Sequence, residues 1–255
     1  MKRPEAWRPS KFVPGPRGLR ASRSLRWVSV SSRLIADLQA ANYARALLAH
    51  ARGHLLDIGC GEVPLYAVYR PLINDVTCID WEHTRHPSPH VDLKADLNAP
   101  LPLADESIDT ILATDVLEHL ADPASAVAEA ARILRPDGKL IVGVPFFYWV
   151  HEQPYDYYRY TEFALRRLAE QSGLNVLELN PYGGIPEILC DIIAKTINFY
   201  APSLLTPFLW PIYSAALIWN ATPWARRLSR RSQRSFPLGY ILVAQKPAPT
   251  HDVEN

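Results

Sequence analysis

The sequence of 255 residues predicts an α/β fold: a mostly parallel sheet with helices on both faces. Short, almost continuous apolar runs alternate with longer segments whose apolar positions recur at steps of three and four. Apolar strands of this kind are typical of a sheet covered on both faces, and their alternation with helices is typical of parallel crossovers. One of these strands also leads directly into a glycine turn, which is typical of a nucleotide-type cofactor site.

The elements follow in order along the chain. A first helix is predicted from Leu34 to about Gly53, and a second from Pro123 to Leu134, where the turn 135–138 ends it. Thr161 is expected to cap a third helix, because its side chain can accept a hydrogen bond from the first turn. The predicted strands are 55–58, 76–79, 90–93, 108–113, 140–144, 176–179 and 240–244.

Domain organisation is predicted from shifts in composition. Residues 1–30 are basic and rich in proline and glycine, which favours a flexible N-terminal arm. Residues 31–247 are expected to form one domain, with an insert at 182–237 that is longer than a sheet connection requires. Residues 248–255 are expected to form a C-terminal tail.

The glycine turn sets the question of the cofactor. The strand that contains Asp57 is followed by Gly59 and Gly61, and a second strand ends at Asp80, about 20 residues downstream, where a ribose-binding carboxylate is expected. The third glycine of a dinucleotide fingerprint is absent. Asp57 would also repel a pyrophosphate but suits a cofactor with an ammonium and a sulfonium, so S-adenosylmethionine is favoured.

Five segments in order, "LLDIGCG", "CID", "ADLNAPLPLADESIDTILATDVLEHL", "ARILRPDGKLIVGVPF" and "HEQPYDYYRYTEFALRRLAEQSGL", resemble the class I S-adenosylmethionine-dependent methyltransferases, especially the type 11-like group. The resemblance implies a Rossmann-like seven-stranded sheet of order 3-2-1-4-5-7-6 with an antiparallel last strand. It also implies that Asp57 and the glycine turn hold the methionine end, Asp80 the ribose and Asp96 the adenine. Val63 and Pro64 depart from the family pattern, in which many members have another glycine. The cofactor-binding residues predicted in this way are Asp57, Gly59, Cys60, Gly61, Asp80, Trp81, Asp96, Leu97 and Thr114.

The segment 145–160 follows the fifth strand of the predicted sheet, where the methyl acceptor must enter. His151 is the first candidate for a catalytic base and His119 the second, because an imidazole can accept a proton near neutral pH. Alternatively, His151 is a loop residue bonded to Glu152 or Asp156, and His119 has a packing or orienting role. The expected substrate-binding residues are Tyr148, Tyr155, Asp156 and Arg159, although a structural ion pair that fixes the loop is the favoured interpretation of the last two.

No metal site is predicted. His83, His86, His90 and Asp92 lie close in sequence, but no ligand spacing repeats, and neighbouring prolines favour an irregular surface loop. Three cysteines without metal-ligand spacing and the lack of an apolar leader favour a cytoplasmic protein. The net charge of +1 argues against a dedicated nucleic-acid binder.

The insert has an unusual composition. Residues 196–225 contain no charged side chain, and five arginines follow within the next nine residues. Prolines interrupt the apolar stretch, and pairing of the strands on either side of the insert excludes a single membrane crossing. Three interpretations remain open: contact of segment 196–234 with an anionic membrane at its inner face, a lid over the acceptor site, or a dimer surface.

The leading hypothesis is O-methylation of a small or lipid-linked acceptor, and the family resemblance implies a saccharide in surface glycan biosynthesis as the first candidate. A methyltransferase acting on a polyprenyl quinone precursor is the alternative that the apolar insert favours. A third hypothesis is a non-catalytic cofactor-binding scaffold that docks at membranes or partners. The sequence leaves open whether the chain is a monomer or a homodimer.

Overall fold

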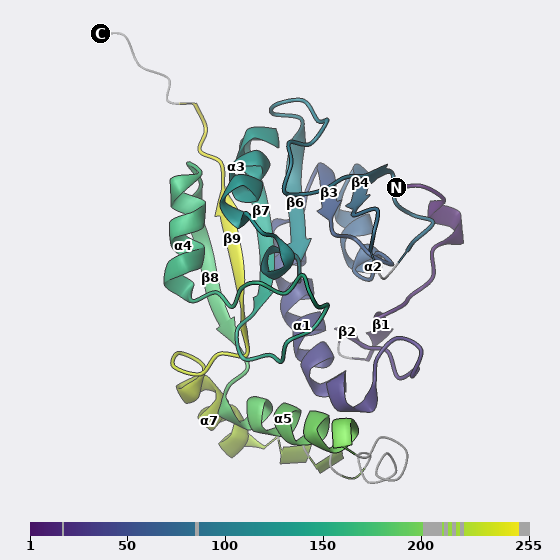
Figure 1. Ribbon diagram of the computed structural model, residues 1–255, viewed down its shortest axis with the longest axis vertical. Coiled ribbons are helices and arrows are strands. Elements are labelled where there is room, and N and C mark those ends of the chain that lie inside the picture. Colours follow the sequence, from purple (N-terminus) through teal and green to yellow (C-terminus); the bar gives the residue numbers. More distant parts are fainter. Residues whose placement is uncertain are drawn as a thin grey trace.

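The computed structural model describes residues 1–16, 18–84, 87–200, 211, 214–215, 218–219 and 222–249. Its centre is a seven-stranded sheet of order β5-β4-β3-β6-β7-β9-β8, in which β9 alone runs antiparallel to its neighbours (Figure 1). In the order of the chain this is 3-2-1-4-5-7-6, so the predicted topology is confirmed. The strands are β3 (His54–Ile58), β4 (Asp75–Asp80), β5 (Leu93–Lys94), β6 (Ile108–Thr114), β7 (Leu134–Pro145), β8 (Asn175–Tyr182) and β9 (Gly239–Gln245).

Helices cover both faces of the sheet. The amphipathic helices α3 (Pro123–Ile133) and α4 (Glu162–Gln171) contribute to the hydrophobic cluster on one face, and α1 (Arg33–His50) contributes to the cluster on the other. The hydroxyl of Thr161 accepts a hydrogen bond from Ala164 N at 3.2 Å, as predicted for a helix cap. The remaining helices are α2 (Tyr66–Tyr69), α5 (Ile185–Tyr200) and α7 (Pro223–Ser232), and 3-10 turns lie at Pro4–Ala6, Val30–Ser32, Arg70–Leu72 and Leu117–His119.

The turn predicted at 135–138 lies within strand β7. Pairing with β6 begins at Leu134 opposite Ile108 and resumes at Lys139 opposite Thr110, so the intervening residues form a bulge. Asp137 takes a positive φ of 63° within this bulge. The turn-forming residues therefore interrupt the ladder without ending it, because the strand continues on both sides of them.

The N-terminal segment does not form the predicted flexible arm. Strands β1 (Phe12–Gly15) and β2 (Gly18–Ala21) pair as an antiparallel hairpin, and Phe12 is only 2% exposed. The indole N–H of Trp7 donates to Val63 O at 3.0 Å, which connects the segment to the glycine turn. The arginine-rich composition concealed these apolar anchors, which bury the segment against α1 and the sheet.

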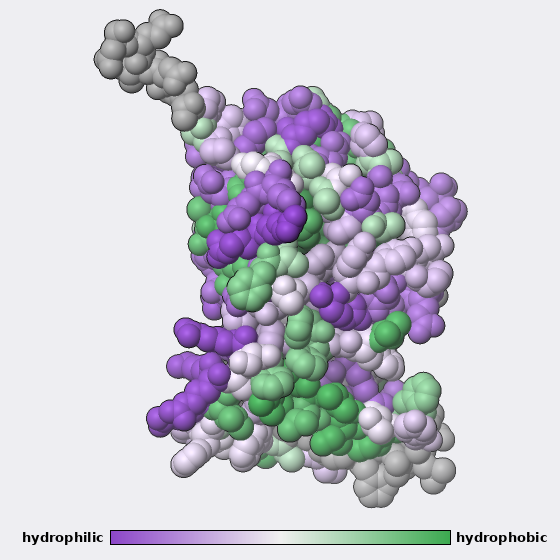
Figure 2. Space-filling model, turned by 60° about the vertical axis from the view of Figure 1, so that its left-hand side comes forward, coloured by the Kyte–Doolittle hydropathy of each residue, from purple (hydrophilic) through white to green (hydrophobic). Residues whose placement is uncertain are grey.

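Helices α5 and α7 pack against each other at the end of the sheet where the parallel strands finish (Figure 1). Figure 2 shows a hydrophobic area over this part of the molecule, with hydrophilic side chains projecting beside it. Among the described residues, no helix combines the length and the hydrophobicity needed to cross a bilayer. Much of the apolar stretch in the insert, including all of 201–210, lies outside the described residues, as does His86.

Candidate active site

A cavity of about 790 Å³ lies at the carboxyl ends of the parallel strands. One side is formed by the segments at the ends of β3, β4 and β5, and the other by the turn after β6, the loop after β7, helix α1 and the N-terminal segment. All nine residues predicted to bind the cofactor line this cavity. A cofactor and an acceptor can therefore occupy the same cavity, as a transfer between them requires.

The glycine turn after β3 is built for close approach by a ligand. Gly59 has a φ of 64°, and an added Cβ would lie 2.4 Å from Val116 Cγ2. The N–H of Gly61 donates to Asp80 Oδ2 at 2.9 Å, which joins the turn to the end of β4. Val63 departs from the pattern of the resembling family, and it adopts a φ of 49° that a β-branched residue rarely takes. A positive φ at such a residue is a local strain in the backbone of this turn.

Asp57 is a buried carboxyl group at the end of β3, with only 4% of the residue exposed. Burial raises its pKa to about 7, against the opposing effect of a hydrogen bond from the hydroxyl of Tyr69. The Tyr69 hydroxyl lies 3.0 Å from Asp57 Oδ2. A positively charged group placed beside Asp57 would restore the ionised form, which is the chemistry expected for a cofactor ammonium.

The other predicted cofactor residues lie along the same edge. Asp80 is buried and also accepts a hydrogen bond from Trp81 N at 2.7 Å. The exposed Asp96 accepts hydrogen bonds from the backbone and side-chain nitrogens of Asn98 at 2.9 and 2.8 Å, which fix its carboxylate. Thr114 ends strand β6 and lines the cavity.

The acceptor side is formed largely by the loop after β7. Tyr148, His151 and Tyr155 line the cavity, as the sequence predicted. The rings of Tyr148 and His151 contact edge to face with centroids 5.1 Å apart, and Tyr155 contacts Trp81 in the same way at 5.0 Å. Trp81 therefore connects the cofactor side of the cavity to the acceptor side.

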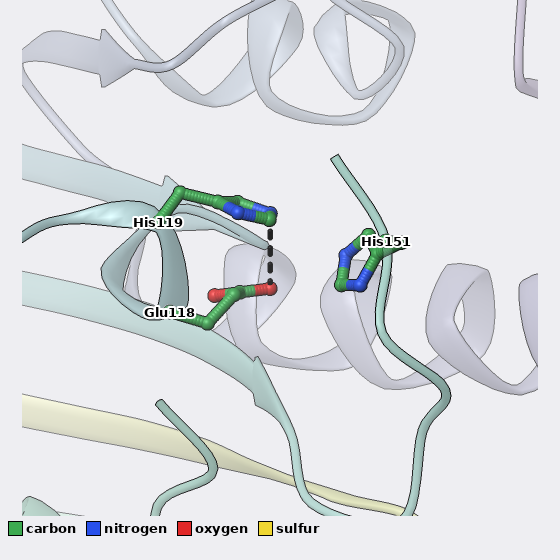
Figure 3. Close-up of side chains that lie close together, drawn as sticks. All are labelled: Glu118, His119 and His151. Carbon is green, nitrogen blue, oxygen red and sulfur yellow. Dashed lines mark ion pairs between the residues drawn. The ribbon is translucent and has the colours of Figure 1, made fainter. Parts of the chain in front are cut away.

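Glu118, His119 and His151 converge at the junction of the two sides. Figure 3 shows the carboxylate and both imidazoles facing one another from the turn after β6 and the loop after β7. Glu118 Oε1 lies 3.9 Å from His119 Nε2, and the two imidazole centroids are 4.8 Å apart. Burial lowers the pKa of His151, which favours the neutral ring at neutral pH.

Asp156 and Arg159 are brought together, but neither lines the cavity. Their side chains form a bidentate ion pair with distances of 2.6 and 2.7 Å, and Asp156 Oδ2 also accepts from His151 N at 2.8 Å. Burial opposes ionisation, but the hydrogen bonds from Arg159 lower the pKa of Asp156 to about 2. The pair therefore stabilises the loop. The structure supports the ion pair, which was the alternative interpretation, and not the predicted contact of Asp156 and Arg159 with substrate.

Sequence reasoning missed several polar groups on the acceptor side. Asp115 lines the cavity and accepts hydrogen bonds from Tyr43 at 2.8 Å and from Gln39 at 3.1 Å. Lys11 of the N-terminal segment reaches the same carboxylate at 3.3 Å. Glu118 was assigned no role, although it lies with Asp115 in the motif "DVLEHL". That motif was the available signal, because it follows a strand that ends at the predicted site.

Residues 56–142 match a family described as a methyltransferase domain. A probable S-adenosylmethionine-dependent methyltransferase of Mycolicibacterium smegmatis is 36% identical over 105 residues, which is 38% of this chain and 41% of the relative. A ubiquinone biosynthesis O-methyltransferase of Xanthomonas oryzae is 31% identical over 111 residues, or 40% of this chain and 46% of the relative. The match therefore spans less than half of either relative.

Solved structures agree with the observed fold. The [4+2]-cyclase SpnF aligns with a TM-score of 0.52 at 20% identity, covering 83% of this chain and 82% of that one. The family match and the relatives identify residues 56–142 as a methyltransferase domain with S-adenosylmethionine as its cofactor, and the fold agrees with the class I architecture. These residues contain most of the motifs from which the sequence predicted the same class.

Proposed function

We propose that the protein transfers the methyl group of S-adenosylmethionine to an oxygen of a small or lipid-linked acceptor, with a saccharide of surface glycan biosynthesis as the first candidate. The observation that carries this proposal is the continuous cavity, which joins the acids after β3 and β4 to an aromatic and imidazole-lined wall. Methyl transfer from a sulfonium needs alignment above all, together with removal of a proton when the acceptor is a hydroxyl.

The residues of the chain divide this work. Asp57, Asp80 and Asp96 would hold the ammonium, ribose and adenine of the cofactor. Tyr148 and Tyr155 would exclude water and position the acceptor. His151, or His119 in second place, would accept the proton from an attacking hydroxyl, because its imidazole lies at the junction of the two sides.

A quinone precursor is the second candidate acceptor. The tyrosines of the cavity wall suit a flat aromatic ring, and the relative from Xanthomonas oryzae carries out O-methylation in ubiquinone biosynthesis, as its name states. The third hypothesis, a scaffold without activity, gains support from SpnF, because a cyclase shares this fold and fold alone does not fix the reaction.

Calorimetry with S-adenosylhomocysteine tests the cofactor site first. We expect binding that Asp80→Ala abolishes and that Asp75→Ala leaves intact, because Asp75 begins the same strand at the opposite edge. Absence of binding to the unaltered protein would refute both enzyme hypotheses. Labelled S-adenosylmethionine, offered with glycan fractions and lipid extracts, then decides between the acceptors: label in quinone lipids alone would refute the saccharide.

An anionic membrane is the partner that we propose for α5 and α7. Five exposed arginines, Arg226, Arg227, Arg230, Arg231 and Arg234, lie on α7 and directly after it. Trp224 of α7 is 81% exposed, and α5, which packs against α7, exposes Ile192, Ile193 and Phe199. Aromatic and aliphatic side chains beside arginines are typical of a surface that binds at the lipid interface.

Sedimentation with phosphatidylserine-containing vesicles tests this contact. Replacing Arg226 and Arg230 by glutamine should reduce binding by roughly 10-fold or more, at about 1 kcal/mol for each charge. The matched control replaces Arg166 and Arg167, two exposed arginines of α4, in the same way. Equal losses in the two double variants would contradict a specific role for α7.

A further inference from the structure

Glu118 is a buried acid whose only near ionisable partner among the described residues is His119, 3.9 Å away. It is 0% exposed, and within the described part of the chain neither of its carboxylate oxygens accepts a hydrogen bond from another residue. Arg159, whose charge acts on Glu118, is already engaged in the bidentate pair with Asp156. An uncompensated carboxylate in a protein interior is costly, so a buried acid that lines a cavity is a candidate to bind a positive charge.

Both neighbouring histidines are oriented for the same purpose. His119 Nδ1 lies 2.8 Å from the carbonyl oxygen of Tyr155, so this nitrogen carries the proton and donates it. His151 Nδ1 lies 3.2 Å from the carbonyl oxygen of Trp149 and 3.3 Å from Asp156 Oδ2, which fixes the same tautomer. In each ring the lone pair is therefore left on Nε2. In histidines that bind a metal through one ring nitrogen, the other ring nitrogen usually donates its N–H to a carbonyl or a carboxylate.

We propose that Glu118, His119 and His151 bind a divalent first-row transition-metal ion whose open coordination positions receive the acceptor oxygen. One ligand atom from each residue lies within 4.8 Å of the others. Bonds of about 2.1 Å place neighbouring ligand atoms about 3 to 3.5 Å apart, so the site needs a small inward movement. Most of this movement falls to His151 on the loop after β7, because Glu118 and His119 already lie 3.9 Å apart on the turn Leu117–His119 and need to close only slightly (Figure 3).

The ligand set selects the class of ion. Two imidazoles and one carboxylate suit Zn²⁺, Fe²⁺, Co²⁺ or Mn²⁺, whereas Mg²⁺ and Ca²⁺ favour oxygen ligands alone. Three protein ligands leave coordination positions open, as in metal sites that bind a substrate. Glu118, His119 and His151 all form part of the same cavity wall, so these positions would face the acceptor.

The role of the ion in transfer rests on the proposed function, whereas its binding does not. The bound ion would lower the pKa of an acceptor hydroxyl, whose proton passes to water in the cavity. The oxygen lone pair then forms the new C–O bond while the C–S bond of the cofactor breaks. The electron pair of the C–S bond stays on sulfur and gives neutral S-adenosylhomocysteine. With the ion bound, both imidazoles are ligands, so this assignment replaces the general-base role of His151.

Calorimetric titration of the chelator-treated full-length protein with ZnCl₂, CoCl₂ and MnCl₂ tests the site. We expect one ion per chain for at least one of these metals, and affinity lowered at least about 100-fold in Glu118→Gln, His119→Asn and His151→Asn. The matched control is His50→Gln, because His50 also lies beside a carboxylate, 2.7 Å from Glu178, but outside the cavity. Absence of binding for all three ions, or unchanged affinity in Glu118→Gln, would overturn the proposal.

Two further measurements exclude loss of folding as the explanation. Saturating ion should raise the Tm of the unaltered protein and of His50→Gln but not of Glu118→Gln, because only a folded chain with an intact site is stabilised by binding. Asp156→Asn should weaken binding by about 10-fold, since Asp156 orients His151 without being a ligand. Equal rises in Tm for all variants would place the ion elsewhere.

Binding of S-adenosylhomocysteine to the metal-free protein separates this inference from the proposed function. If the cofactor product binds and no ion does, the metal site is refuted and the methyltransferase remains. If the ion binds at Glu118 and the cofactor product does not, the metal site remains and the methyltransferase is refuted. Methyl transfer that survives chelation unchanged would overturn the catalytic role of the ion.

Discussion

The two sides of the cavity are constructed in different ways. The cofactor side consists of short segments at the ends of adjacent parallel strands: Gly59 and Gly61 follow β3, Asp80 ends β4, and Asp96 follows β5. The acceptor side combines side chains from the N-terminal segment, α1, the turn after β6 and the loop after β7. Recognition of the cofactor is therefore local in sequence, whereas recognition of the acceptor depends on contacts between distant segments.

Each side nevertheless contains one buried acid, Asp57 on the cofactor side and Glu118 on the acceptor side. Asp57 has a hydrogen bond from Tyr69, and Glu118 has no partner among the described residues except the nearby His119. Burial raises the pKa of both carboxyl groups above the usual range. Burying an acid lowers the stability of the domain at Asp57 and at Glu118. Under the two proposals, the cofactor ammonium at Asp57 and the metal ion at Glu118 would supply the missing positive charge.

The largest effect is expected on the cofactor side. Asp80→Ala removes the carboxylate that accepts from Gly61 N and that would bind the ribose hydroxyls, so affinity for S-adenosylhomocysteine should fall at least about 100-fold. Calorimetry measures this loss, and the acceptor side should keep its affinity for the metal ion. A simultaneous loss of ion binding would show that the two sides are not independent.

Asp57→Asn should change the pH dependence of stability. The pKa of Asp57 rises from 3.8 in the unfolded chain to about 7 in the fold, so the unaltered protein loses stability as the pH rises between these values. The free energy of unfolding should fall by about 4 kcal/mol for this pKa difference of about three units. The variant has no ionisable group at this position and should not show this fall. Urea unfolding at pH 4 and pH 7.5 measures it, with Asp75→Asn as the control. Equal slopes in all three proteins would contradict the burial argument.

Tyr43→Phe tests how α1 supports the acceptor side. The variant removes the 2.8 Å hydrogen bond to Asp115, which should cost about 2 kcal/mol in the free energy of unfolding. Cofactor affinity should stay within about twofold, because Tyr43 lines the acceptor side of the cavity. A larger loss of cofactor than of acceptor affinity would break the proposed division between the two sides.

Lys11→Met is expected to have the smallest effect. Its ammonium lies 3.3 Å from Asp115 but is 38% exposed, so the pair should contribute less than about 1 kcal/mol to stability. Once an acceptor is identified, its KM should rise a few-fold while the KM for S-adenosylmethionine stays unchanged. Arg8→Met, an exposed change in the same segment, is the control. A rise in the KM for the cofactor alone would show that the N-terminal segment belongs to the cofactor side of the cavity and not to the acceptor side.

The strands of the sheet could be predicted because each is an apolar run whose side chains pack on both faces. The bulge at 135–138 could not, since a turn sequence within a ladder resembles a turn that ends one. The N-terminal segment was mispredicted for a related reason: its many arginines outweighed Trp7 and Phe12, whose burial depends on surfaces elsewhere in the chain.

By itself, the sequence determined the fold and the cofactor, because strand periodicity, the glycine turn and the acids after each strand are local features with local physical causes. Only the tertiary structure decided which histidines meet. The sequence offered His151 and His119 as separate candidates for a base and His83, His86 and His90 as neighbours in the chain, whereas the fold brings His151 together with Glu118 and His119. Parallel strands place their carboxyl ends at one edge of the sheet, so groups far apart in sequence converge there.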